Sequence, residues 1–142
     1  DGESVFDICM KHLKEAPVPP SEVRGEPIPA ELEKLIRLQV YHYIEASAIF
    51  ISDQVGIGKP NPKLYLRAVE RVGVTPAEAM YVGDHPINDV DAAKAAGLIT
   101  VWNRREGKHV GGRGATRPDH VIFNFWDLLE LLENQEVKRL KN

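Results

Sequence analysis

The sequence has a single cysteine, Cys9, and five histidines among its 142 residues. One cysteine cannot form a disulfide bond within the chain, which is typical of proteins in a reducing compartment. It also cannot anchor a structural zinc ion, because the histidines show no spacing that would supply the other ligands. We therefore expect a cytoplasmic location and no zinc site.

Long hydrophobic runs and an excess of one charge are also lacking. No apolar segment approaches the roughly 20 residues of a membrane-spanning helix. The formal net charge is -3 with both signs interspersed, so we expect neither nucleic acid nor a membrane surface as a partner. A hydrophobic content of 43% allows one compact core. The first residue is Asp1 rather than methionine, from which we expect a fragment of a longer protein.

Prolines crowd the first part of the chain, where they interrupt regular structure. Residues 16–20 read Ala-Pro-Val-Pro-Pro, and two more prolines follow at positions 27 and 29. Proline fixes its own φ angle and has no backbone N–H to donate. We predict a short helix over 7–14, linker-like sequence up to residue 28, and a helix over 29–43. The predicted division is an appendage at 1–28 and an α/β domain at 29–142.

From residue 46 onward, short apolar runs alternate with stretches of helical period. The predicted strands are 48–51, 79–82, 98–102 and 120–123, and the predicted helices are 62–72, 89–96 and 126–133 with a frayed tail after it. Asn61 and Asn88 are the predicted caps of the first two helices. Strands that alternate with helices form parallel sheets with crossover connections. The predicted fold class is therefore α/β.

Three charged residues stand near the strand-to-helix junctions of this pattern: Lys59, Asp84 and Asp89. In an open parallel sheet, ligands bind at the carboxyl ends of the strands, where these residues fall. Two carboxylates suit Mg²⁺, which takes hard oxygen donors, and the lysine ammonium can neutralise a transferring phosphoryl group. We predict all three as catalytic residues, with Asp84 and Asp89 as the metal ligands.

Each of the three residues also has an ordinary structural interpretation. An aspartate is common in turns after strands, and one in the first turn of a helix stabilises the helix dipole. A Lys-Pro pair in a loop is commonly solvated surface. The functional interpretation depends on the conjunction of lysine, strand, Gly-Asp and second aspartate in one order along the chain.

At these residues the chain resembles the haloacid dehalogenase-like (HAD) hydrolase superfamily, which is dominated by phosphatases. Residues 52–60, Ser-Asp-Gln-Val-Gly-Ile-Gly-Lys-Pro, look like the approach to the family's third motif, whose lysine falls on Lys59. Residues 82–90, Val-Gly-Asp-His-Pro-Ile-Asn-Asp-Val, look like its fourth motif, whose acidic pair falls on Asp84 and Asp89. The resemblance covers residues 46–133.

The resemblance implies a Rossmann-like parallel sheet with flanking helices, and Mg²⁺-dependent hydrolysis of a small phosphomonoester through a covalent aspartyl intermediate. In that mechanism Asp84 ligates the metal, Asp89 assists it, and Lys59 steadies the nucleophile and the phosphate. The 2-haloacid dehalogenase branch fits less well, because its members usually lack the Gly-Asp form of the fourth motif.

The family's first two motifs have no counterpart in the sequence. The first, Asp-x-Asp-Gly-Thr, supplies the nucleophile and the general acid, but residues 6–9 place Cys9 where the second acid would stand. Ser52 is too close to Lys59 to supply the hydroxyl of the second. We therefore expect a core that is incomplete on its N-terminal side, with residues 1–28 as a helical cap remnant. We also expect no turnover by this chain alone.

Two other classes of function remain as alternatives. A non-catalytic HAD-like module that binds a partner would explain the missing motifs, although it leaves the retention of the three charged residues unexplained. A phosphoacceptor receiver domain has its lysine after the acids, whereas Lys59 precedes Asp84. Substrate identity and oligomeric state are left open.

Other conspicuous residues receive structural interpretations. His85 lies between the two acids and is left out of the metal set. A basic glycine-rich loop is expected to be solvated; its basic members are Arg104, Arg105, Lys108, Arg113 and Arg117. Trp102 and Trp126 are expected to pack in or near the core.

Overall fold

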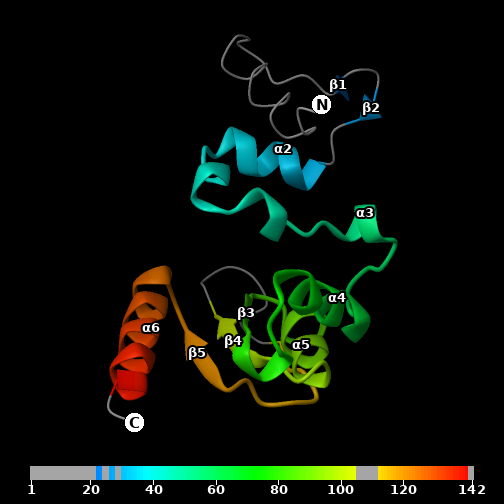
Figure 1. Ribbon diagram of the computed structural model, residues 1–142. Helices are drawn as coiled ribbons and strands as arrows, with labels where there is room; N and C mark the ends of the chain where they lie inside the picture. The colour runs from blue at the N-terminus through cyan, green and yellow to red at the C-terminus, as the bar shows by residue number, and fades with distance from the viewer. Residues whose placement is uncertain (1–21, 24–25, 28–29, 105–111, 141–142) are drawn as a thin grey trace. The chain divides into compact units, whose positions relative to one another are not determined.

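The computed structural model describes residues 22–23, 26–27, 30–104 and 112–140 (Figure 1). The chain divides into two compact units, residues 1–56 and residues 57–142. The predicted helix at 7–14 and the predicted boundary between residues 28 and 29 lie outside the described residues.

The first unit contains a small antiparallel ladder where the sequence predicted only linker. Strand β1 (Glu22–Val23) pairs with β2 (Glu26–Pro27), with Glu22 opposite Pro27. The prediction that the prolines forbid regular structure is wrong here, because Pro27 ends a two-residue edge strand, where a missing N–H is tolerated.

Helix α2 (Ala30–Arg37) is shorter than the predicted helix over 29–43. It buries Leu32 and Ile36. Gln39 then adopts a φ of 55°, a left-handed conformation that ends the helix. A short 3₁₀ turn, η1 (Tyr41–Tyr43), covers the rest of the predicted range.

The predicted strand at 48–51 is wrong. The chain forms a 3₁₀ turn η2 (Ala46–Ala48), then an irregular segment, then the four-residue helix α3 (Ser52–Val55). Ile51 is nevertheless buried, and the segment lines an open hollow of about 420 Å³ together with Leu35 of α2. A strand needs a neighbour to satisfy its backbone groups, and no described strand pairs with this segment.

The second unit contains the predicted parallel sheet. Strands β3 (Met80–Gly83), β4 (Ile99–Asn103) and β5 (His120–Ile122) lie in the order β3-β4-β5. Both ladders are parallel. Three of the four predicted strands and the α/β fold class are thereby confirmed.

Helices flank this sheet (Figure 1). The second unit contains α4 (Pro62–Val72), the 3₁₀ turn η3 (Pro76–Glu78), the wide π-type turn η4 (Pro86–Asp91), α5 (Ala92–Ala95) and α6 (Phe125–Leu140). Helices α4 and α5 lie beside each other, and α6 lies next to β5. The unit's core is formed by the central strand β4, in which Thr100 and Val101 are fully buried, and by Ala93 of α5.

Helix α6 differs from its prediction in two respects. It continues to Leu140, where a frayed tail after residue 133 was expected. Trp126, predicted to pack in or near the core, is 79% exposed. It stands in the first turn of α6, where its backbone N–H donates to Asn124, whereas the half-buried positions of the helix include Leu128 and Leu131. The apolar period of this helix is too broad to assign one face from sequence.

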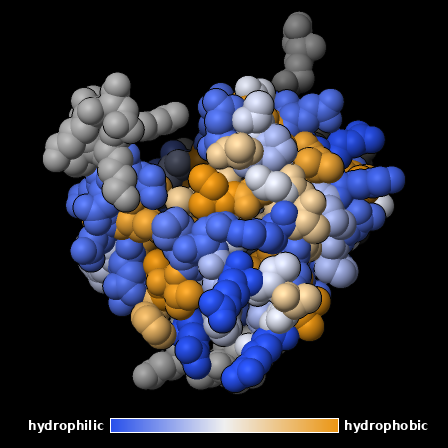
Figure 2. Space-filling model, turned by 90° about the horizontal axis from the view of Figure 1, so that it is seen from below, coloured by the Kyte–Doolittle hydropathy of each residue, from blue (hydrophilic) through white to orange (hydrophobic). Residues whose placement is uncertain are grey.

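The surface of the molecule shows hydrophilic and hydrophobic residues interspersed on the face drawn in Figure 2. Among the described residues, no helix is long and apolar enough to span a bilayer.

Asp119 locks β4 to the segment before β5. Its carboxylate accepts hydrogen bonds from the Thr100 backbone N–H at 2.8 Å and from the Thr100 hydroxyl at 2.9 Å. The other oxygen pairs with Lys94. The hydrogen bond from Lys94 and that from the Thr100 N–H lower the pKa of Asp119 to about 2.

We expect Asp119→Asn to lower the free energy of unfolding by about 1 kcal/mol at pH 7, a value kept small because the Lys94 pair is partly exposed. A carboxyl whose pKa is depressed in the folded state stabilises the fold above its unfolded pKa, here near 3.8, and loses this contribution as pH falls towards 2. Urea unfolding at pH 7, 4 and 2.5 should show the two proteins converging with acid. A constant gap across this range contradicts the prediction.

Candidate active site

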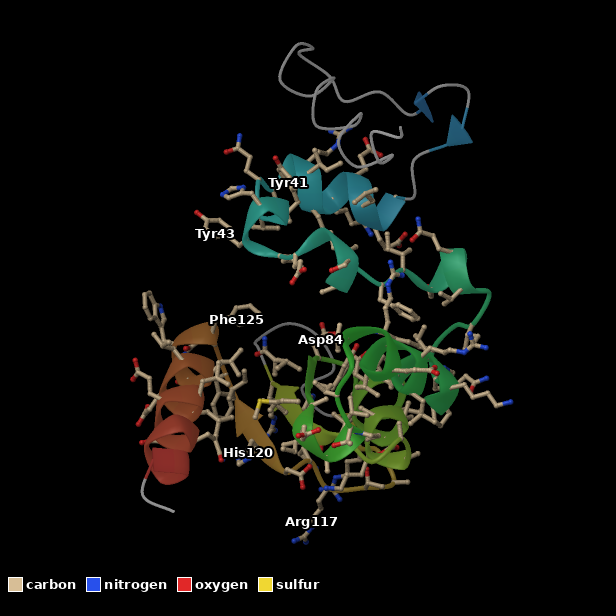
Figure 3. All side chains as sticks on the ribbon, viewed as in Figure 1. Tyr41, Tyr43, Asp84, Arg117, His120 and Phe125 are labelled. Carbon is tan, nitrogen blue, oxygen red and sulfur yellow. The ribbon has the colours of Figure 1, made fainter. Side chains whose placement is uncertain are left out.

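The predicted site residues come from the carboxyl end of β3 and from the loop before α4. Strand β3 ends at Gly83, and the half-buried Asp84 follows it at the same end of the sheet (Figure 3). Helix α4 begins at Pro62, and the Asn61 side chain caps it by accepting from the Lys63 backbone N–H at 3.0 Å. This cap confirms the predicted helix start and fixes the loop that carries Lys59.

Lys59 and Asp89 form an ion pair across 30 residues of sequence. The Lys59 Nζ donates to Asp89 Oδ1 at 2.6 Å. The Asp89 side chain is 6% exposed and the Lys59 side chain 44% exposed. The carboxylate is therefore held inside the protein, while the ammonium that neutralises it keeps access to the surface.

The Asp89 carboxylate has two further donors. The Tyr81 hydroxyl donates to Oδ1 at 3.1 Å, and the His85 backbone N–H donates to Oδ2 at 3.0 Å. Burial disfavours the charged form of Asp89, but the hydrogen bonds from Lys59 and His85 outweigh it and lower the pKa of Asp89. Asp89 is thus held as a charged group whose two oxygens are both engaged.

Gly83 makes room for this carboxylate. A Cβ atom built at Gly83 would lie 2.5 Å from Cβ and Cγ of Asp89, closer than real side chains approach. The glycine of the Gly-Asp pair is therefore required by the packing of Asp89 against β3.

His85 caps the turn that carries Asp89. Its Nδ1 accepts from the backbone N–H groups of Ile87 at 3.2 Å and Asn88 at 3.1 Å, so the neutral imidazole carries its proton on Nε2. The prediction that Asn88 caps this helix is wrong, because the helix already begins at Pro86 as the π-type turn η4. Turns of this kind are frequent at functional sites.

Two tyrosines, Tyr65 and Tyr81, pack around the Lys59–Asp89 ion pair and were not among the predicted site residues. Tyr81 presents its ring to Lys59, with the Nζ 5.4 Å from the ring centroid. Tyr65 meets Tyr81 edge to face at 4.7 Å between centroids and donates its hydroxyl to the Asn88 carbonyl at 2.7 Å. The two tyrosines connect helix α4, strand β3 and turn η4. The only sequence feature that could have indicated the position of Tyr81 is the alternation of side chains along the strand.

The negative charge of Asp84 also acts on Tyr81. Burial raises the pKa of the Tyr81 hydroxyl, and the negative charges of Asp89 and, more weakly, Asp84 raise it further. The Asp84 backbone carbonyl accepts the indole N–H of Trp102 at 3.1 Å, which ties the end of β3 to the end of β4. Asp84 thus fastens the end of β3 to Trp102 through its backbone and contributes a weak negative charge at Tyr81.

The acidic side chains of this part of the fold are carboxylates, whose hard oxygen donors suit Mg²⁺. Within the described residues, no group of three or more His, Cys, Asp and Glu side chains is placed to hold a metal ion. Mg²⁺ needs fewer protein ligands, since it retains several waters and takes one or two carboxylates together with substrate phosphate. The carboxylates of Asp84 and Asp89 fit that requirement.

The basic glycine-rich loop is only partly described. Arg105 and Lys108 lie outside the described residues. Arg104 lies over the Trp102 ring at 5.5 Å. Arg117 is exposed at the end of the second unit opposite to Asp84 (Figure 3), so its charge is not available at Asp84.

The end of this loop is fastened to η4. The Asp91 carboxylate accepts from the Ala115 N–H at 2.7 Å and from the N–H and hydroxyl of Thr116 at 2.9 and 2.6 Å. A Cβ at Gly114 would lie 2.6 Å from the Asp91 carboxylate, so glycine is needed for this close approach. Asp91 is thus a structural acid that joins η4 to the end of this loop.

Comparison with known proteins identifies the family. The profile of the haloacid dehalogenase-like hydrolases matches residues 13–97, more than half of the chain. The chain belongs to the haloacid dehalogenase-like hydrolase family. The resemblance inferred from the third and fourth motifs is thereby confirmed.

Similar proteins within the family include phosphatases and a dehalogenase. A glyceraldehyde 3-phosphate phosphatase from Methanopyrus kandleri is 47% identical over 77 residues, which are 54% of this chain and 32% of the relative. A HAD phosphatase structure from Thermococcus onnurineus is 33% identical with a TM-score of 0.63 and covers 76% of this chain and 47% of its own. A 2-haloacid dehalogenase structure from Pseudomonas syringae is 36% identical with a TM-score of 0.53, over 59% and 36% of the two chains.

The chain spans less than half of the length of each of these proteins. The HAD phosphatase structure and this chain share the Rossmann-like fold. In the described residues of this chain, the fold consists of three parallel strands with flanking helices.

Proposed function

We propose that residues 57–142 supply the lysine and the acidic pair of a Mg²⁺-dependent phosphatase that acts on small phosphomonoesters in the cytoplasm. The observation that carries the proposal is the ion pair between Lys59 and Asp89 at 2.6 Å, in the same unit whose parallel strand β3 ends just before Asp84. Phosphatases among the similar proteins support it.

The described residues can perform three tasks in such a reaction. The Lys59 ammonium, partly exposed and held by Asp89, presents a positive charge to an incoming phosphate. Asp89 keeps this ammonium in place through a carboxylate that stays charged. Asp84 offers a carboxylate at the sheet end as the metal ligand, with Asp89 assisting through its charge. Mg²⁺ held there would neutralise phosphate oxygens during transfer.

The proposed reaction passes through an aspartyl phosphate. A carboxylate nucleophile attacks phosphorus, the bond to the ester oxygen breaks, and that oxygen takes a proton from a general acid; water then hydrolyses the acyl phosphate. Residues 1–142 offer no motif for the nucleophile or for the general acid. We therefore propose that both come from polypeptide outside this sequence, and that this chain alone is inactive.

The test is hydrolysis of a panel of phosphate esters by the 142-residue chain and by any longer natural product of the same gene, with Mg²⁺ and with EDTA. The panel includes glyceraldehyde 3-phosphate and a generic aryl phosphate. We expect Mg²⁺-dependent release of phosphate by the longer product only, and loss of this activity in Asp84→Ala. Failure of the longer product on every ester, or full activity of Asp84→Ala, would sink the proposal.

Two alternative functions are tested with the same two proteins, with 2-chloropropionate added to the compounds. Chloride release from 2-chloropropionate would favour a dehalogenase, which the similarity to the Pseudomonas syringae structure brings into consideration. If no longer product exists and the chain is inert towards every compound, the non-catalytic module becomes the better description.

A further inference from the structure

Asn103, which no sequence motif singled out, carries a buried oxygen atom without a partner. The residue is 9% exposed. Its Oδ1 has no hydrogen-bond partner among the described residues, and it is the one buried side-chain oxygen or nitrogen there of which this is true. Buried polar groups are nearly always hydrogen-bonded, because an unsatisfied one has lost its water without compensation. An exception of this kind calls for a ligand.

The position of Asn103 places it beside the acidic pair. It is the last residue of β4, and the parallel register pairs Gly83 with Trp102. Continuing this register by one residue sets Asp84 opposite Asn103. Residues opposite one another in adjacent strands project from the same face of a sheet.

The two strand ends are also fastened together at this point. The Trp102 indole N–H donates to the Asp84 carbonyl at 3.1 Å, so the separation of β3 and β4 is fixed just where the strands end. The extended register therefore sets Asn103 and Asp84 side by side at the edge of the sheet where ligands bind in this class of fold.

We propose that the Asn103 amide oxygen is part of the magnesium site and accepts a hydrogen bond from a water molecule bound to the ion beside Asp84. This inference rests on the proposed function, which supplies the ion. Mg²⁺ retains several waters when proteins bind it, and these waters need acceptors. A neutral amide oxygen meets the need without adding another negative charge beside two carboxylates.

The test uses Asn103→Leu, which keeps the shape of the side chain and removes its polar atoms. Binding of Mg²⁺ to the 142-residue chain is followed by ¹⁵N NMR, with NaCl used to match ionic strength. The indole N–H resonance of Trp102 reports on the site because of its bond to Asp84, and that of the exposed Trp126 serves as an internal reference.

We expect Asn103→Leu to raise the half-saturating Mg²⁺ concentration about tenfold, the usual effect of losing an outer-sphere partner. In EDTA the same variant should have a higher melting temperature than the parent, because the unsatisfied oxygen is gone. Asn134→Leu, the same change at an exposed position of α6, should leave Mg²⁺ binding unchanged.

A second variant keeps the inference falsifiable if Asn103→Leu fails to fold. Asn103→Asp adds a charge at the same point and should tighten Mg²⁺ binding several-fold. Unchanged half-saturation in the folded variants, while Asp84→Asn abolishes binding, overturns the role of Asn103 and leaves the proposed function standing. Absence of any Mg²⁺-dependent shift in the parent chain overturns the role of Asn103 in this chain, whereas the proposed function is decided separately by the hydrolysis assay on the longer product.

Discussion

Replacement of Gly83 by alanine is expected to lower the free energy of unfolding by about 3 kcal/mol, at the upper end of the usual cost of overpacking. The added methyl group would lie 2.5 Å from Cβ and Cγ of Asp89. Displacing Asp89 costs free energy, because the whole residue is only 4% exposed and its carboxylate accepts hydrogen bonds from Lys59, Tyr81 and His85. The substitution therefore strains η4 and loosens the ion pair at once.

Urea unfolding of the variant measures the loss of stability, and the amide resonance of His85 reports on the contact to Asp89 Oδ2. Gly58→Ala is the matched control, since a Cβ at Gly58 meets no atom within 4 Å and its φ is not in the left-handed region. It should change stability by less than about 0.5 kcal/mol. Equal effects of the two substitutions would mean that Asp89 does not pack on β3 as described.

The fold could be predicted from sequence where the pattern was local and repeated. Strands β3, β4 and β5 follow from apolar runs bounded by glycine or polar turns, and their alternation with helices specifies parallel pairing. The segment at 48–51 has an equally apolar sequence but forms no strand, because a strand also needs a neighbour. The end of α2 was predicted too late for a different reason. Gln39 adopts the left-handed conformation that ends the helix, but glutamine does not indicate such a position in a sequence as glycine does.

The site could be predicted only in part. The spacing of Lys59, Asp84 and Asp89 predicts all three at one end of the sheet, but it does not reveal that Asp89 accepts hydrogen bonds from three donors. Tyr81 reads as an ordinary strand residue, and Asn103 was expected to begin the exposed glycine-rich loop, whereas it is the buried last residue of β4. What lies opposite these two residues is decided by strand register and by the packing of η4, and the periodicity of the sequence predicts neither.

Replacement of Lys59 by methionine is expected to lower the free energy of unfolding by about 2 kcal/mol at pH 7, because it leaves a buried carboxylate without its counter-charge. The figure is below the usual range for breaking a buried pair, since the Lys59 side chain is 44% exposed and water already screens it. Lys63→Met, an exposed lysine of the first turn of α4, should be close to neutral.

The pH dependence separates this effect from a loss of packing. In the parent chain the pKa of Asp89 is lowered, so its interactions stabilise the fold above the unfolded pKa and are lost as pH falls below it. Without Lys59, burial is opposed only by the hydrogen bonds from His85 and Tyr81, and the pKa of Asp89 should rise. The stability gap between Lys59→Met and the parent should therefore widen from pH 4 to pH 7, and Asp89→Asn should abolish that widening in the double variant. A gap that is the same at both pH values would show that the lysine contributes its hydrocarbon chain rather than its charge, and Asp89 would then need another partner to remain ionised in the folded protein.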